Sequence, residues 1–220
     1  LWSPLLSELS AQGFERKNCH LLAIPKLNTI NDILAQLRSQ LPNEKITLLG
    51  FSLGGYLASA FAVKYPEMIE RLIVLSNFPS ALPEKEVKER KRTVDWITQR
   101  GYNGIPKQRI LNLLDKSAHQ RTDIIKLIED MDKSLGKEVL LQQLLATTSR
   151  ENLMNKLSLL SCQKYFAAGD SDALVKTAQL TQWSKDNNSC YFTQFRQTGH
   201  MLPLEQPRLL ANWLIKLLDK

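Results

Sequence analysis

Residues 46–58 read ITLLGFSLGGYLA, and they are the most informative part of the chain. The apolar run at 46–49 predicts a buried strand, and the small and apolar residues after Gly54 predict a helix. Between them lies a Gly-x-Ser-x-Gly turn centred on Ser52. We expect glycine at Gly50 and Gly54 because the turn is sharp, so that a Cβ at either position would collide with the neighbouring strand or helix.

The strand, turn and helix together predict a nucleophilic role for Ser52. Its side chain would stand above the edge of the sheet, at the positive end of a helix, and the Leu53 N–H would point at a developing oxyanion. The alternative interpretation is a glycine-rich turn in which Ser52 only caps the helix.

A nucleophilic serine needs a base, and the base needs an acid that orients it. The candidate base is His200, which lies between a strand-like run at 190–195 and a terminal amphipathic helix that begins at Pro207. A loop at the carboxyl end of a strand can reach into a cleft, whereas a core histidine would lie inside a periodic segment. The other histidines, His20 and His119, are expected to be partly buried and solvated, respectively.

The candidate acid lies where an apolar run at 164–168 ends in the turn Gly169–Asp172. Asp170 and Asp172 are both candidates at this point, and Asp170 also suits a turn or cap role. With either aspartate, the order along the chain is serine, aspartate, histidine.

These three motifs resemble those of the α/β-hydrolase fold family. The matching segments are GFSLGG at 50–55, GDSD at 169–172 and GHMLPLEQP at 199–207, in the order that the family uses. The resemblance covers about residues 1–80 and 160–220. The family pattern places the acid at the last position of Gly-x-x-Asp, which favours Asp172 over Asp170 by analogy. The resemblance therefore implies a triad of Ser52, Asp172 and His200, with no cofactor and no metal.

The periodicity predicts an α/β fold, with a mainly parallel twisted sheet and helices on both faces. We expect strands at 20–24, 45–49, 71–76, 164–168 and 190–195, and flanking helices at 3–12, 30–41, 53–65 and 207–218. Between them, helices are expected at 84–100, 106–116, 121–135 and 137–147, with no strand among them.

In the family, this strand-free position holds a helical cap over the active site. We therefore predict an α/β-hydrolase core of residues 1–80 and 156–220, with a helical cap insertion at 81–155. Phe51, Trp96 and Met201 are expected to bind substrate. Packing within the cap is an equal alternative for Trp96.

The family has several strands before the one that leads to the nucleophile, whereas only 20–24 is evident here. We therefore expect an N-terminally truncated version of a longer protein, without the first strands and half of the oxyanion hole. The strand that normally separates 20–24 from 45–49 would then be missing. Those two segments would either pair directly or leave backbone N–H and C=O groups unpaired in the sheet.

The net charge is +7, from 29 Lys and Arg against 22 Asp and Glu. The basic residues are densest within 83–126, where interleaved glutamates favour ion pairing along a helix over nucleic-acid binding. No apolar run approaches the roughly 18 residues of a membrane span. Cys19, Cys162 and Cys190 form no Cys-x-x-Cys pair, which favours reduced thiols in a cytoplasmic protein. The sequence does not indicate an oligomeric state.

The expected function is that of a serine hydrolase, which would cleave a carboxylic ester or thioester of a small, largely apolar acyl group through an acyl-enzyme on Ser52. Another triad enzyme is an alternative: a lactonase, a peptidase, a carbon–carbon bond hydrolase or an acyltransferase. A catalytically impaired or silent binding protein of the same fold is a second alternative. A binder of polyanions or membrane surfaces, acting through the basic segment, is a third.

Overall fold

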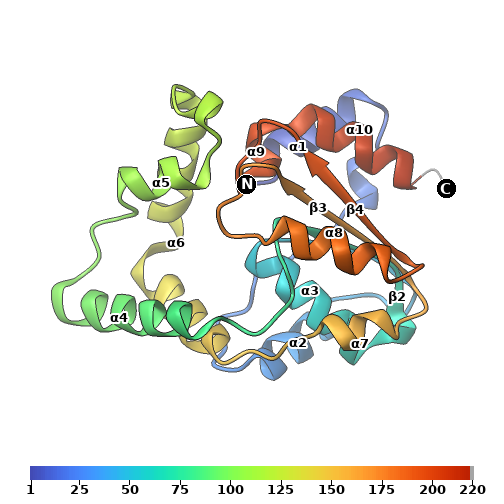
Figure 1. Cartoon of the computed structure of the whole chain (residues 1–220), viewed down its shortest axis with the longest axis horizontal. Coiled ribbons are helices and arrows are strands. Elements are labelled where there is room, and N and C mark those ends of the chain that lie inside the picture. The colour runs from blue at the N-terminus through green and yellow to red at the C-terminus, as the bar shows by residue number, and fades with distance from the viewer. Residues whose placement is uncertain (219–220) are drawn as a thin grey trace.

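The computed structural model describes residues 1–218, and its strands form one sheet (Figure 1). The strands are β1 (Ile46–Phe51), β2 (Ile69–Leu75), β3 (Gln163–Gly169) and β4 (Cys190–Phe195). They lie in the order β1-β2-β3-β4, and every neighbouring pair is parallel. Phe51 pairs with Leu75, and Leu75 pairs with Ala167, so the carboxyl ends of the strands meet at one edge of the sheet.

Helices cover both faces of this sheet, as predicted (Figure 1). They are α1 (Ser3–Ala11), α2 (Ile30–Ser39), α3 (Leu53–Lys64), α4 (Glu84–Arg100), α5 (Lys107–Leu113), α6 (Thr122–Thr148), α7 (Met154–Ser158), α8 (Thr177–Lys185), α9 (Leu202–Glu205) and α10 (Pro207–Leu218). Short 3-10 turns lie at Arg16–Asn18, Pro66–Met68 and Lys116–Ala118. The predicted helices at 121–135 and 137–147 are the two parts of α6, which breaks at Gly136 with φ 72°.

The core forms on both faces because successive side chains of β2 point in opposite directions. Leu72 and Val74 pack under α3, α7 and α8. Ile73 and Leu75 pack under α1 and α10 on the other face. These side chains are at most 1% exposed, as expected for a parallel sheet that is covered on both sides.

The predicted strand at 20–24 is wrong. These residues pair with no strand in the described part of the chain, and β1 is the first strand of the sheet. The sequence predicted either that residues 20–24 pair directly with 45–49 or that backbone groups stay unpaired. The second outcome is observed, because the backbone groups on the outer edge of β1 have no partner strand within the described sheet. Instead, Ile24 and Leu27 pack against a small cluster that joins α2, α3 and α6. A strand needs a neighbour, and apolar content alone does not supply one.

Residues 81–155 form what we call the helical insertion, which projects from the sheet between β2 and β3 (Figure 1). Ile110, Ile124 and Ile128 of this insertion pack against Met201 and Leu204, so it contacts the loop that carries His200. The helix α7 begins just before residue 155 and packs on α3. The division into a core and a cap at these boundaries stays a prediction.

Two histidines differ from expectation. His20 is exposed rather than partly buried, and His119 is half-buried rather than solvated, with Nε2 placed 3.0 Å from the Leu111 carbonyl oxygen. All three cysteines are free thiols, of which only Cys190 is fully buried. Within residues 1–218, no helix has both the length and the apolar character needed to cross a bilayer.

Candidate active site

Ser52 lies at the sharp turn between β1 and α3, with φ 51° and ψ −118°. A non-glycine residue with positive φ is strained, and such strain persists only where the surroundings hold it in place. Here the Ser52 N–H donates to the Leu75 carbonyl at 2.9 Å. The Ser52 carbonyl accepts from the N–H groups of Gly55, at 2.9 Å, and Tyr56, at 3.2 Å. The neighbouring strand and the first turn of α3 therefore fix the conformation that presents the hydroxyl.

The glycines around Ser52 have unequal roles. A Cβ on Gly50 would lie 2.2 Å from the Gly54 carbonyl oxygen, so this position requires glycine. A Cβ on Gly54 would meet no atom within 4 Å, so the expectation of a collision at Gly54 is wrong. The second crowded position is Gly55, where a Cβ would lie 3.0 Å from the Asn77 Cβ. Gly50 and Gly55, and not Gly54, thus allow α3 to lie close to the sheet.

The structure brings Ser52, His200 and Asp172 together. The Nε2 atom of His200 lies 2.8 Å from Ser52 Oγ, and its Nδ1 atom lies 3.0 Å from each carboxylate oxygen of Asp172. His200 is 5% exposed and Asp172 is 9% exposed. With the ring proton on Nδ1 facing the carboxylate, Nε2 can accept the proton of the serine hydroxyl.

Asp172 and Asp170 have different surroundings. Asp172 Oδ1 accepts from the N–H groups of Leu174, at 2.9 Å, and Val175, at 3.2 Å, so the carboxylate is held rigidly against His200. Asp170 is exposed, and its Oδ1 accepts from the Thr198 N–H at 3.2 Å, which is the turn role considered above. The geometry therefore places Asp172, and not Asp170, against the imidazole.

Leu53 is the first residue of α3, and its N–H donates no hydrogen bond to any residue from 1 to 218. The first N–H groups of a helix have no intrahelical acceptor, and the helix dipole favours negative charge there. This N–H is therefore free to bind an oxyanion formed next to Ser52.

The three residues expected to bind substrate lie in different environments. The Phe51 ring centroid is 5.3 Å from that of His200, so Phe51 borders the triad. Met201 is buried against the helical insertion. Trp96 is 59% exposed and carries the Arg100 guanidinium over its ring at 4.6 Å. No contact in the described part of the chain links Trp96 to the triad.

Glu205 holds the His200 loop against the helical insertion, a role that sequence analysis did not assign. Its Oε2 atom accepts from the Gly199 N–H at 3.0 Å and from the Asp115 N–H at 2.7 Å. The His200 N–H in turn donates to the Leu113 carbonyl at 2.8 Å. Burial raises the pKa of the Glu205 carboxyl. A buried acid inside the apolar segment LPLEQP was the signal that could have indicated this role.

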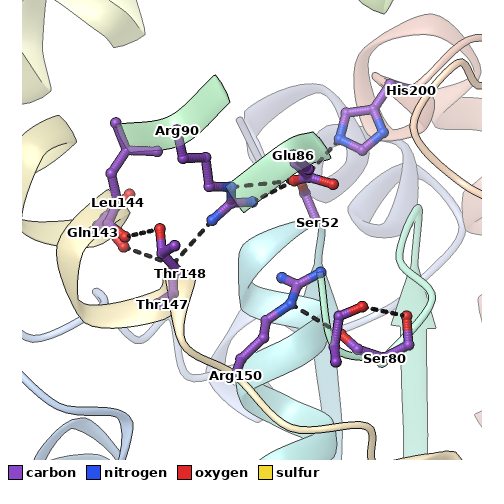
Figure 2. A network of polar contacts seen from close by, with 11 residues as sticks. Ser52, Ser80, Glu86, Arg90, Gln143, Leu144, Thr147, Thr148, Arg150 and His200 are labelled. Carbon is purple, nitrogen blue, oxygen red and sulfur yellow. Dashed lines mark hydrogen bonds and ion pairs between the residues drawn. The ribbon is translucent and has the colours of Figure 1, made fainter. Parts of the chain in front are cut away.

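Two arginines also lie at this edge of the sheet (Figure 2). Arg90 comes from α4 and is hydrogen-bonded to Glu86 and Thr147. Arg150 follows α6, and its Nε donates to the Ser80 carbonyl at 3.1 Å. Nothing in the sequence separates these two arginines from the many other charged residues of the helical insertion.

Comparison with known proteins agrees with this architecture. A sequence model of the alpha/beta hydrolase fold family matches residues 12–207. The chain therefore belongs to the α/β-hydrolase fold family.

Curated relatives match only part of the chain. The abhydrolase domain-containing protein abhd-5.2 of Caenorhabditis elegans is 36% identical over 72 residues, which are 31% of this chain and 16% of that protein. The proline iminopeptidase of Saccharolobus solfataricus is 46% identical over 63 residues, which are 28% of this chain and 20% of that protein. The chain thus matches a fifth or less of the length of these relatives.

A solved structure matches nearly the whole chain. It is that of a thermophilic esterase from Thermogutta terrifontis, with a TM-score of 0.84 and 24% sequence identity. The match covers 99% of this chain and 84% of the esterase. At this identity the likeness establishes the fold.

Proposed function

We propose that this chain is a serine hydrolase that cleaves a carboxylic ester, or a related acyl bond, through an acyl-enzyme on Ser52. The observation that carries the proposal is the continuous contact from Ser52 Oγ to His200 Nε2, and from His200 Nδ1 to Asp172. The hydroxyl is also held in a strained turn beside an unused N–H at a helix start. Nucleophile, base, orienting acid and oxyanion donor are the parts that acyl transfer needs.

In the first half of the proposed reaction, Ser52 Oγ attacks the carbonyl carbon and its proton passes to His200 Nε2. Asp172 holds the imidazole in the correct orientation and stabilises the imidazolium that forms. The Leu53 N–H donates to the tetrahedral oxyanion. His200 then returns the proton to the leaving alcohol oxygen, and the acyl group stays on Ser52.

In the second half, His200 accepts a proton from water, and the resulting hydroxide attacks the acyl carbon. A second tetrahedral oxyanion forms beside Leu53 and collapses to the free acid, with the proton returned to Ser52 Oγ. The ring of Phe51 beside His200 would contact the acyl chain. The proposal needs no cofactor.

Hydrolysis of short-chain 4-nitrophenyl esters tests this function. We expect turnover by the protein as it stands, and a loss of about 10⁴-fold or more in kcat for Ser52→Ala. Ser10→Ala, an exposed position on α1, is the matched control and should keep full activity. Turnover that Ser52→Ala retains would contradict the proposal.

A further inference from the structure

The Arg150 guanidinium is fixed in place but leaves most of its donors unused. Its Nε donates to the Ser80 carbonyl at 3.1 Å, and its central carbon lies 4.6 Å from the centroid of the Tyr56 ring. Tyr56 is itself 1% exposed and anchored by a hydrogen bond from its hydroxyl to the Glu151 carbonyl. Within residues 1–218, no acceptor binds the two terminal nitrogens of Arg150, and neither is sealed from solvent.

Arg90 lies close enough to act on Arg150 electrostatically. Burial, and then the positive charge of Arg90, lower the pKa of Arg150 to about 10. The Glu86 carboxylate lies near both arginines, but its Oε1 atom is bound by Arg90, at 2.9 and 3.1 Å. In this cluster of Arg90, Arg150 and Glu86, one carboxylate faces two guanidinium groups. The cluster therefore carries an uncompensated positive charge, which a bound anion would offset.

The cluster lies at the same edge of the sheet as Ser52. Tyr56, under the Arg150 guanidinium, is about one helical turn beyond Ser52 on α3. Ser80 is in the loop after β2, which is the strand next to β1. Figure 2 shows the Arg150 guanidinium pointing toward the part of the site where Ser52, Glu86 and Arg90 lie.

We propose that Arg150, supported by Arg90, binds an anionic oxygen group on the substrate, so that the ester cleaved at Ser52 carries a carboxylate or phosphate at its far end. The inference rests on the proposed function, because it gives the substrate of that same site a charge. A guanidinium presents its N–H groups in a planar fork that matches two oxygens of such a group.

A matched pair of esters tests the inference. Mono-4-nitrophenyl adipate carries a free carboxylate, and 4-nitrophenyl methyl adipate is its neutral counterpart with the same leaving group. The measured quantity is the ratio of kcat/KM for the anionic ester to that for the neutral ester. We expect Arg150→Met to lower this ratio about 10- to 100-fold, the range of a charge-assisted hydrogen bond. Arg92→Met, an exposed arginine of α4, removes the same charge and should change the ratio less than about twofold.

Arg150→Lys keeps the charge but loses the fork, so the expected loss is intermediate. The Arg150→Lys variant also replaces Arg150→Met in this experiment if Arg150→Met does not fold. An unchanged ratio in both variants, with normal turnover of the neutral ester, would overturn the inference for a carboxylate and leave the proposed function standing.

Anion binding to the Ser52→Ala protein tests the role of Arg150 independently of catalysis at Ser52, and it distinguishes a carboxylate from a phosphate. Calorimetric titration with adipate and with inorganic phosphate needs no turnover. We expect at least one of them to bind, and to bind at least about tenfold more weakly when Arg150→Met is added. The tighter anion identifies the group on the substrate as carboxylate or phosphate. If neither anion binds, or if both bind equally well without Arg150, the inference is wrong, even if Ser52 proves to be catalytic.

Discussion

The Nε2 atom of His200 lies 2.8 Å from Oγ of Ser52, although 148 positions separate the two residues in the chain. The parallel sheet makes this contact possible, because it brings the loops after β1 and β4 to the same edge. The further contact of His200 with Asp172 adds the loop after β3. Three loops from one edge of the sheet thus build the proposed catalytic group.

Substituting Asp172 and Asp170 with asparagine should show which of the two carboxylates orients His200. Asp172→Asn would present an amide to His200 Nδ1 and favour the wrong tautomer, so we expect kcat to fall about 10³- to 10⁴-fold. Asp170→Asn should change kcat less than about threefold, because Asp170 is exposed and its Oδ1 accepts from the Thr198 N–H and the Ser171 hydroxyl, not from His200. Steady-state ester hydrolysis by both variants measures the difference. Equal losses in the two would contradict the assignment of the acid.

Alanine at two neighbouring glycines should have opposite effects on stability. Gly50→Ala places a Cβ 2.2 Å from the Gly54 carbonyl oxygen, so the turn must shift, and we expect severe loss of folded protein. Gly54→Ala meets open space inside α3, where alanine favours the helix by up to about 1 kcal/mol. Thermal unfolding of both variants checks this. A Gly54→Ala protein as unstable as Gly50→Ala would show that Gly54 is as crowded as Gly50.

The buried Glu205 should make the unfolding free energy depend on pH. Because burial raises its pKa above the ordinary value of 4.5, the folded protein binds this proton more tightly than the unfolded chain does. Its contribution to stability is therefore fully present below the unfolded pKa and is lost as the pH rises through the folded pKa. We expect the free energy of unfolding to fall between about pH 4 and pH 7 relative to that of Glu205→Gln, which cannot ionise.

Urea unfolding of both proteins across this range measures the difference, and the contributions of all other groups cancel in the comparison. Parallel pH profiles of the two proteins would mean that Glu205 ionises as freely in the folded protein as in the unfolded chain.

Local sequence patterns predicted the parts of this protein that depend on neighbouring residues. The turn around Ser52 needs a strand before it and a helix after it, and the adjacent residues predict both. The carboxyl ends of the strands then brought His200 and the turn with Asp172 to the same edge.

Most of what the sequence did not predict depends on contacts between residues far apart in the chain. Residues 20–24 have the composition of a strand but pair with none within residues 1–218. Glu205 binds the N–H of Asp115, 90 positions away, and Arg150 binds the carbonyl of Ser80, 70 positions away. Gly54 stands in a motif that predicts crowding, but only the packing of α3 on the sheet decides which glycines are crowded.

Covalent labelling can show whether Ser52 is an activated nucleophile. A fluorophosphonate probe would be added to the folded protein and to Ser52→Ala and His200→Ala, and the adduct would be located by mass after digestion. We expect one adduct on Ser52, absent in Ser52→Ala and formed far more slowly in His200→Ala. A folded protein that is not labelled, or labelling on Ser52 that does not need His200, would contradict this expectation.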